Sequence, residues 1–178
     1  FLIDDGNTAE VKEYLKAHCL LEHVTLVFLR QNYGQQNAVL CGLQRAGKYD
    51  YVAVMDDDLA HPVLTLKKMY EKIQEGYELV YGIAEKGKRY SLGSRARDVL
   101  FEQALRCPKG KKVSSFRIMT QAVAKEVSQR TGSFFYFSAA ALKITQKVEN
   151  VYYKSAVESA RSSGYNVWKR MQLFGKIV

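Results

Sequence analysis

The sequence contains few of the residues that break or crosslink a fold. Two prolines and twelve glycines in 178 residues argue against long disordered linkers. The three cysteines, Cys19, Cys41 and Cys107, form no CxxC pair. They therefore predict free thiols in a reducing compartment and neither a disulfide framework nor a zinc site. A chain of this length is long enough for one domain with a core of its own.

Long apolar runs are also missing. No stretch approaches the ~20 consecutive apolar residues that a membrane-spanning helix requires. No signal peptide is visible either, because Phe1-Leu2-Ile3 leads directly into acidic residues. The first three residues have the pattern of a strand end, so we expect an earlier strand to be missing at the N-terminus.

Acidic residues are the minority charge. The 27 lysines and arginines outnumber the 18 aspartates and glutamates, which gives a formal net charge of +9. Such a balance favours anionic partners, namely nucleic acid, phosphorylated ligands or an acidic membrane surface. The basic residues crowd the second half of the chain and the carboxylates are commoner in the first half. From charge alone, however, a merely solvated basic surface is the simpler interpretation.

Short apolar runs alternate with helical patterns through residues 1–82. The strands are expected at 1–3, 24–29, 51–55 and 78–82, and the helices between them at 9–17, 35–46 and 64–75. This alternation predicts an α/β fold with right-handed crossovers, a mainly parallel sheet and helices on both faces. We interpret 1–178 as a single domain in which residues 1–82 form a nucleotide-fold half.

The second half has a less regular pattern. It contains a basic loop at 85–90, helical stretches at 91–105 and 121–129, and an apolar and aromatic segment at 134–142. A strand at 148–153 and a basic amphipathic tail at 161–178 follow. The apolar segment fits either a core helix or a surface that meets lipid.

Three adjacent carboxylates, Asp56, Asp57 and Asp58, follow the apolar strand at 51–55. Ligands bind at the carboxyl ends of strands in open α/β sheets. In an extended segment Asp56 and Asp58 point to one side and Asp57 to the other. Two hard carboxylates on one side suit Mg²⁺ or Mn²⁺. Acids can also stabilise the N-terminus of a helix, but the position after a buried strand favours a metal.

Two further segments carry groups that suit a ligand. Asp4-Asp5-Gly6 ends the first strand; by itself it predicts a turn before a helix capped by Asn7 or Thr8, and its carboxylates could also accept hydrogen bonds from a nucleotide base. Ser114-Ser115-Phe116-Arg117 follows a lysine-rich turn. Its hydroxyls and guanidinium suit a phosphate, although the tetrapeptide alone is more typical of a surface turn.

Four motifs in this order resemble family 2 glycosyltransferases of the GT-A fold: Ile3-Asp4-Asp5-Gly6-Asn7, Asn32-Tyr33-Gly34-Gln35-Gln36, Met55-Asp56-Asp57-Asp58-Leu59-Ala60-His61-Pro62 and Ser115-Phe116-Arg117. Within that family the sequence is most similar to the branch that moves a sugar from a nucleotide onto a polyprenyl or dolichyl phosphate in cell envelope biosynthesis. The resemblance covers roughly the whole chain, apart from the family's first strand.

The resemblance implies a role for each matching residue. The nucleotide sugar would be bound by Asp4, Asp5, Gly34, Asp56 and Asp57. Asp56 and Asp58 would be the two acids of a DxD motif that holds Mg²⁺ or Mn²⁺. The acceptor phosphate would be received by Ser114, Ser115 and Arg117. Asp58 and Arg117 would thus be the catalytic residues. Residues 1–82 would be the nucleotide- and metal-binding half of the domain, and residues 83–178 the acceptor-binding half.

The implied reaction is a metal-dependent displacement at the anomeric carbon, with inversion, of a UDP- or GDP-linked sugar by a polyprenyl phosphate. An ionised phosphate needs no strong general base, so catalysis would rest on positioning and on the metal. The resemblance implies a cytoplasmic domain at the inner face of a membrane, contact with the membrane surface, and full-length relatives that often continue into transmembrane helices. It leaves room for a homo-oligomer.

Three alternatives remain open from the sequence. The same fold could transfer sugar to a saccharide, which requires a carboxylate base outside the metal pair. The chain could be a catalytically silent domain that serves in assembly. A basic nucleic-acid-binding module is permitted by the net charge of +9, but an acidic sheet edge repels phosphate in the absence of a metal, so nucleic acid is not the expected partner.

Overall fold

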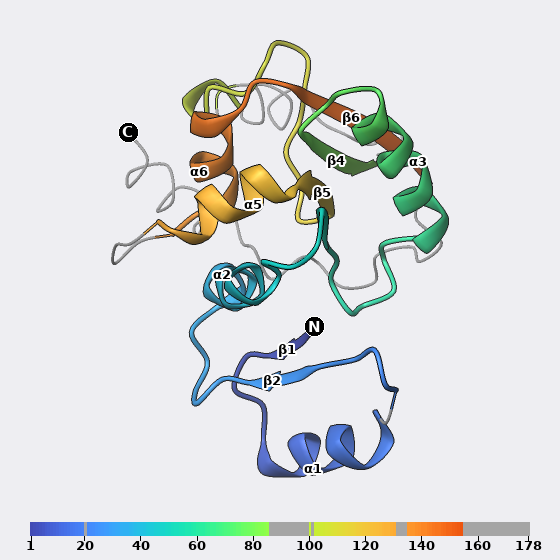
Figure 1. The fold of residues 1–178 in the computed structure, drawn as a ribbon, viewed down its shortest axis with the longest axis vertical. Helices are drawn as coiled ribbons and strands as arrows, with labels where there is room; N and C mark the ends of the chain where they lie inside the picture. Colours follow the sequence, from blue (N-terminus) through green and yellow to red (C-terminus); the bar gives the residue numbers. More distant parts are fainter. Residues whose placement is uncertain (20, 86–99, 101, 131–134, 155–178) are drawn as a thin grey trace.

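In the computed structural model, residues 1–19, 21–85, 100, 102–130 and 135–154 are described. Strands and helices alternate as far as β4, and β5, two helices and β6 follow (Figure 1). The strands are β1 (Leu2–Asp4), β2 (Leu26–Phe28), β3 (Tyr51–Val54), β4 (Leu79–Ala84), β5 (Arg117–Thr120) and β6 (Val148–Tyr153). The helices are α1 (Ala9–His18), α2 (Gln35–Arg45), α3 (Val63–Gln74), α5 (Gln121–Ser128) and α6 (Phe137–Ile144).

The α/β class is confirmed, and the strands form a mixed rather than a uniformly parallel arrangement. β1 and β2 pair in parallel. The other four strands form a sheet in the order β3-β5-β4-β6. There β4 and β6 are parallel, whereas β5 runs antiparallel to both of its neighbours. The alternation of strands and helices, which predicts parallel strand pairs, ends at β4. β5 comes later in the chain, so that prediction does not apply to its direction.

Helices cover both faces of the four-stranded sheet, as expected. Along β4, Leu79 and Tyr81 point into a core shared with α5 and α6, and Val80 points into a second core with Met69 and Ile73 of α3. This is the alternation of a strand that is buried on both sides. All five side chains are buried, so the sheet is a rigid support for the loops at its ends.

Several local predictions are confirmed. Thr8 caps α1 by accepting a hydrogen bond from the Val11 amide, and all three cysteines are free. The apolar segment at 134–142 is a core helix where it is described, because Phe137 and Leu142 of α6 are buried. The predicted loop at 85–90 apart from its first residue, most of the helix expected at 91–105 and the tail at 161–178 lie outside the described residues. Within the described part, no helix combines the length and apolar character needed to cross a bilayer.

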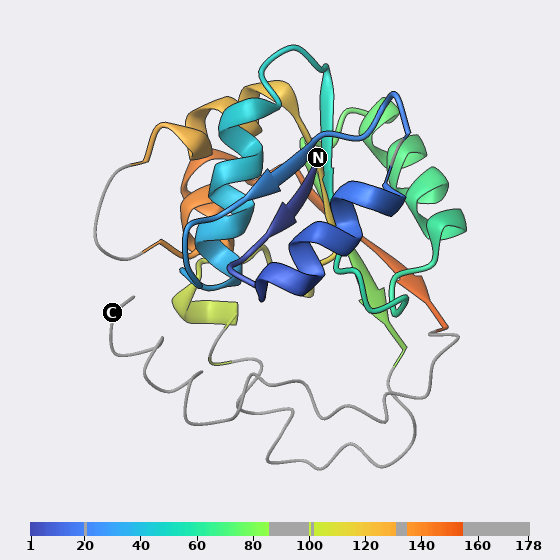
Figure 2. The ribbon, with the colours of Figure 1, turned by 90° about the horizontal axis from the view of Figure 1, so that it is seen from below.

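The β1–β2 pair and the four-stranded sheet are separate, and no strand described in one pairs with a strand of the other. Among the described residues, β1 pairs only with β2 and β3 pairs only with β5. α2 lies between the β1–β2 pair and the larger body in Figure 1, and Figure 2 shows β1, β2 and α1 from below. Residues of β1 and β3 line the same cleft. Ala53 is exposed in the middle of β3, although its apolar neighbours predict a strand covered on both faces.

Candidate active site

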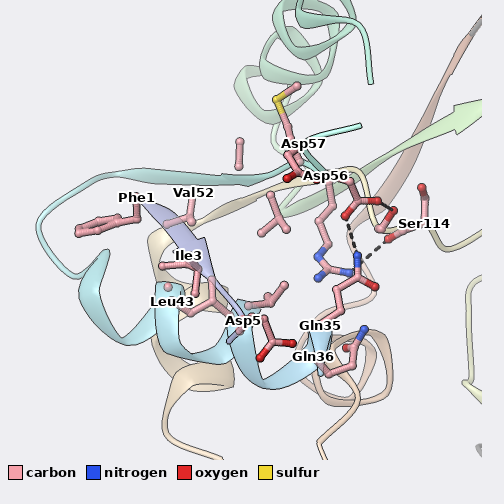
Figure 3. Close-up of a pocket in the computed structure, with 18 of the residues that line it drawn as sticks. Phe1, Ile3, Asp5, Gln35, Gln36, Leu43, Val52, Asp56, Asp57 and Ser114 are labelled. Carbon is pink, nitrogen blue, oxygen red and sulfur yellow. Dashed lines mark hydrogen bonds between the residues drawn. The ribbon is translucent and has the colours of Figure 1, made fainter. Parts of the chain in front are cut away.

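A cleft of about 920 Å³ lies between β1, α2, β3 and the segment that leads into β5. This volume is typical of pockets for small molecules and cofactors. One part of the cleft is apolar, with Ile3, Leu43 and Val52. The other part is polar and contains the ends of strands (Figure 3); its main members are Asp5, Gln35, Asp56, Asp58, Ser115 and Arg117. The polar part therefore brings together most of the site residues that were predicted from both halves of the chain, with Gln35 in addition; Asp4 and Gly34 do not line the cleft.

The carboxylate of Asp56 joins the two halves of the cleft. Gln35, in the first turn of α2, donates a hydrogen bond from Nε2 to Asp56 Oδ1 at 2.6 Å. Ser115, two residues before β5, donates from Oγ to Asp56 Oδ2 at 2.7 Å (Figure 3). Hydrogen bonds to an ionised carboxylate are stronger than those between neutral groups. The sequence places these three residues far apart, and the fold brings them within direct contact.

The three acids lie on a closed loop after β3. The strand ends at Val54 and the backbone bends at residues 57–59, so the strict alternation of an extended segment does not reach them. The Ala60 amide donates to Asp58 Oδ1 at 3.0 Å. Leu59 has a φ of 61°, which is strained for a residue with a side chain. Asp57 lines the cleft together with Asp56 and Asp58.

His61 closes this loop from its far end. Its Nδ1 accepts a hydrogen bond from the Asp56 amide at 3.0 Å, and its ring stacks on Phe116 with a centroid distance of 4.6 Å. Burial lowers the pKa of His61, a shift that the neighbouring Asp56 and Asp58 carboxylates oppose. A backbone amide only donates, so Nδ1 is unprotonated here and the neutral ring carries its proton on Nε2. His61 belongs to the motif at residues 55–62, but it was not predicted from the sequence as a site residue.

The first acidic turn contributes one of its two carboxylates to the cleft. Asp5 lines the cleft, and its Oδ1 accepts a hydrogen bond from the Tyr33 amide at 2.8 Å. Asp4 is buried and is absent from the cleft lining; its Oδ1 accepts hydrogen bonds from the backbone and side chain of Asn7. Asp4 thus holds the turn together, and Asp5 is the one placed to meet a ligand.

Gly34 marks the start of α2 and does not itself line the cleft. It precedes the helix with a φ of 86°, a conformation that favours glycine. The next two residues, Gln35 and Gln36, do line the cleft. Gln35 is the site residue that sequence reasoning missed, although it belongs to the motif that was quoted. Only the distance to Asp56 singles it out.

Arg117 extends the site towards the second half of the chain. Its side chain is 3% exposed and lies over the ring of Phe137, with a distance of 3.8 Å to the centroid. Nη1 donates to the Ser114 carbonyl at 3.3 Å, and Nε has no partner among the described residues. Burial lowers the pKa of the guanidinium, while Tyr81, Tyr136 and Asp56 act in the opposite direction. A buried cation with spare donors is suited to an anion.

The residues at the loop fit a hard divalent cation that is bound together with a phosphate. Among the described residues, no group of three or more His, Cys, Asp or Glu side chains is arranged to hold a metal ion. Mg²⁺ usually takes only one or two protein carboxylates and completes its shell with water and substrate phosphates. Asp56 and Asp58 supply such a pair, and each carboxylate oxygen can accept more contacts than the hydrogen bonds it receives here.

The fold and the site define an α/β domain with an acidic cleft at the ends of its strands, the general arrangement of nucleotide-binding α/β proteins. The family model described as glycosyl transferase family 2 matches residues 1–143, and the chain belongs to this family.

Several relatives are similar over the same region. One, an undecaprenyl-phosphate 4-deoxy-4-formamido-L-arabinose transferase from Klebsiella pneumoniae, is 27% identical over 128 residues, which cover 71% of this chain and 38% of the relative. Another, of the same name from Pectobacterium carotovorum, is 28% identical over an equal share. An uncharacterized glycosyltransferase from Bacillus subtilis is 30% identical over 58% of this chain and 32% of its own length. The chain thus spans well under half of these relatives.

Proposed function

We propose that this chain is the catalytic domain of an inverting enzyme that transfers a sugar from a UDP- or GDP-linked donor to a polyprenyl phosphate, with Mg²⁺ or Mn²⁺. The observation that carries the proposal is the contact between Ser115 and Asp56 at 2.7 Å. It makes the acidic loop and the Ser-Phe-Arg segment two walls of one cleft. Membership of the family and the names of the undecaprenyl-phosphate transferases among the relatives support the same conclusion.

The donor would occupy the acidic side of the cleft. Asp5 is anchored by the Tyr33 amide and keeps a second carboxylate oxygen for hydrogen bonds from a base or ribose. Gln35 fixes Asp56 from α2, so the carboxylate is oriented before a ligand arrives. A divalent cation at Asp56 and Asp58 would neutralise the diphosphate and stabilise its departure. Pre-organised groups of this kind lower the cost of binding and of reaction.

The acceptor phosphate would occupy the side formed by Ser114, Ser115 and Arg117. The guanidinium carbon lies 3.8 Å from the centroid of the Phe137 ring, and Nη1 donates to the Ser114 carbonyl; these contacts restrict the group before an anion binds. In the proposed step, an oxygen of the ionised acceptor phosphate forms a bond to the anomeric carbon. The bond from that carbon to the donor diphosphate breaks on the opposite side, and no proton has to be removed. The residues therefore act by positioning, which can supply a large part of the barrier reduction.

We propose that the acidic loop also faces the membrane surface. Leu59, Val63 and Leu64 lie beside the acids and are 81%, 71% and 82% exposed. Lys67 and Lys68 are exposed one turn further along α3. An apolar tip followed by lysines suits an anionic lipid surface, and a lipid phosphate has to reach the cleft from such a surface.

Replacing Leu64 with aspartate is expected to weaken binding of the chain to vesicles of phosphatidylglycerol and phosphatidylcholine by about 30-fold, since burial of one leucine is worth roughly 2 kcal/mol. Co-sedimentation with the vesicles measures the effect. Leu21→Asp is the matched control, because Leu21 is 69% exposed on the connection between α1 and β2. Equal loss in both variants would count against this surface.

Donor binding tests the proposal directly. A thermal-shift screen of UDP- and GDP-sugars, each with and without Mn²⁺, should give one donor that raises the melting temperature only when Mn²⁺ is present. Shifts that are independent of the metal would contradict the metal-dependent part of the proposal. If no nucleotide sugar shifts the melting temperature at millimolar concentration, the proposal fails as a whole.

A further inference from the structure

The loop that carries the acids is held in shape by one histidine. Residues 56–61 leave β3 and turn back before α3, and the turn includes Leu59 in the left-handed region with a φ of 61°. Such a conformation is unfavourable for a leucine, and it persists only where surrounding contacts impose it. Two hydrogen bonds close the loop: Ala60 amide to Asp58 Oδ1, and Asp56 amide to His61 Nδ1, both at 3.0 Å.

The position of His61 is fixed from outside the loop. Its side chain is 7% exposed. The imidazole stacks on Phe116, with an interplanar angle of 10° and a centroid distance of 4.6 Å, and it meets the edge of Tyr153 at 6.5 Å. Phe116 is fully buried in the core beneath α3. The ring is therefore a rigid support, and its Nδ1 is an acceptor at a fixed point.

His61 Nδ1 holds Asp56, the residue whose carboxylate joins the two walls of the cleft. The Asp56 amide donates to Nδ1, and His61 Nε2 lies 3.8 Å from Asp56 Oδ2. The same Oδ2 accepts the hydrogen bond from Ser115, and Phe116 follows Ser115 in the chain. His61 thus contacts both the backbone of the acidic loop and the segment that presents Ser115.

We propose that His61 is a positioning residue: through its Nδ1 and its stacking on Phe116 it sets the direction of the Asp56 carboxylate towards the cation and the donor diphosphate. The inference rests on the proposed function. His61 does not line the cleft, so it acts through Asp56 and not on a substrate. Residues that orient metal ligands in this way typically contribute about 10- to 100-fold to metal affinity.

Three substitutions at His61 distinguish the effect of the Nδ1 acceptor from the effect of ring packing on Phe116. His61→Asn can place an amide oxygen near the position of Nδ1, His61→Gln carries its amide too far along the side chain, and His61→Phe keeps the stacked ring but has no acceptor. Binding of Mn²⁺ in the presence of UDP or GDP is measured by electron paramagnetic resonance of the free ion, and the melting temperature of each protein without metal is measured in parallel. His18→Phe, at an exposed histidine of α1, is the control.

We expect His61→Phe and His61→Gln to weaken Mn²⁺ binding about 10- to 100-fold, His61→Asn, which keeps an acceptor but loses the stacked ring, to lose less than either, and His18→Phe to have no effect. Equal affinity in all His61 variants, or equal losses in Asn and Gln, would overturn the positioning role. If His61→Phe does not fold, the comparison of Asn with Gln decides. Absence of Mn²⁺ and nucleotide binding in the native chain would instead refute the proposed function.

Discussion

Replacing Asp58 with asparagine is expected to lower the rate of sugar transfer by about 100-fold or more and to abolish the Mn²⁺-dependent thermal shift. Asp58 is exposed, and its Oδ1 accepts the Ala60 amide, a hydrogen bond that an asparagine oxygen can also accept. The substitution therefore removes the negative charge and leaves the loop closed, so the melting temperature without ligand should not change.

Asp50→Asn is the matched control for this experiment. Asp50 is an exposed carboxylate at the opposite end of β3, and removing its charge should affect neither transfer nor the thermal shift. If Asp58→Asn retained both the transfer rate and the Mn²⁺-dependent shift, the assignment of Asp58 to the cation would be wrong.

The second large effect is expected at Arg117. Arg117→Lys keeps the positive charge but replaces the planar, forked donor set by a single ammonium group. We expect transfer to a polyprenyl phosphate to fall by about 100-fold because the acceptor is no longer held in line, whereas the affinity for the donor should change little. Transfer rates as a function of acceptor concentration, together with calorimetric titration of the donor, give the two quantities.

Lysine is preferred to alanine at this position because Arg117 is buried and stacked on Phe137. Alanine would leave a void beside the ring and would mix a loss of stability with a loss of activity. Arg130→Lys, at an exposed arginine just after α5, is the control. Parallel losses of donor affinity and transfer in Arg117→Lys would contradict its assignment to the acceptor phosphate.

The parts of the fold that could be predicted from the sequence depend on local patterns. Apolar runs such as Tyr51–Val54 and the helical spacing of α1 and α3 are recorded in neighbouring residues, so their type and approximate bounds follow. The antiparallel direction of β5 is different. It depends on how the long segment after β4 returns to the sheet, and no local pattern in that segment specifies the direction.

The candidate site was predictable at the level of motifs and less so at the level of side chains. Asp5, Asp56, Asp58, Ser115 and Arg117 do line one cleft, because acids at strand ends and a Ser-Phe-Arg segment have a recognisable order. The turn of Asp4 towards Asn7 and the reach of Gln35 to Asp56 depend on backbone angles and on packing between distant segments, which the sequence does not display.

Gly6 is a motif residue that the backbone conformation itself requires. It has a φ of 82°, and a Cβ there would lie 2.3 Å from the backbone nitrogen of Asn32. Only glycine allows the turn after β1 to approach the turn before α2 so closely. The same approach lets Asp5 accept the Tyr33 amide. The Asp-Gly pair in the first motif is therefore explained by backbone contact, and Asp5 is the carboxylate of this turn that lines the cleft.

Under the proposed function one cleft joins a nucleotide-linked sugar to a lipid phosphate, so formation of the lipid-linked product is the decisive experiment. The native chain is incubated with the radiolabelled donor that the thermal-shift screen selects, Mn²⁺ and polyprenyl phosphate in detergent, and the product is separated by extraction and its anomeric configuration is determined. We expect a sugar-phosphate-lipid of inverted configuration that forms with polyprenyl phosphate and not with unphosphorylated polyprenol. Transfer to polyprenol or to a saccharide at the same rate, or a product of retained configuration, would contradict it.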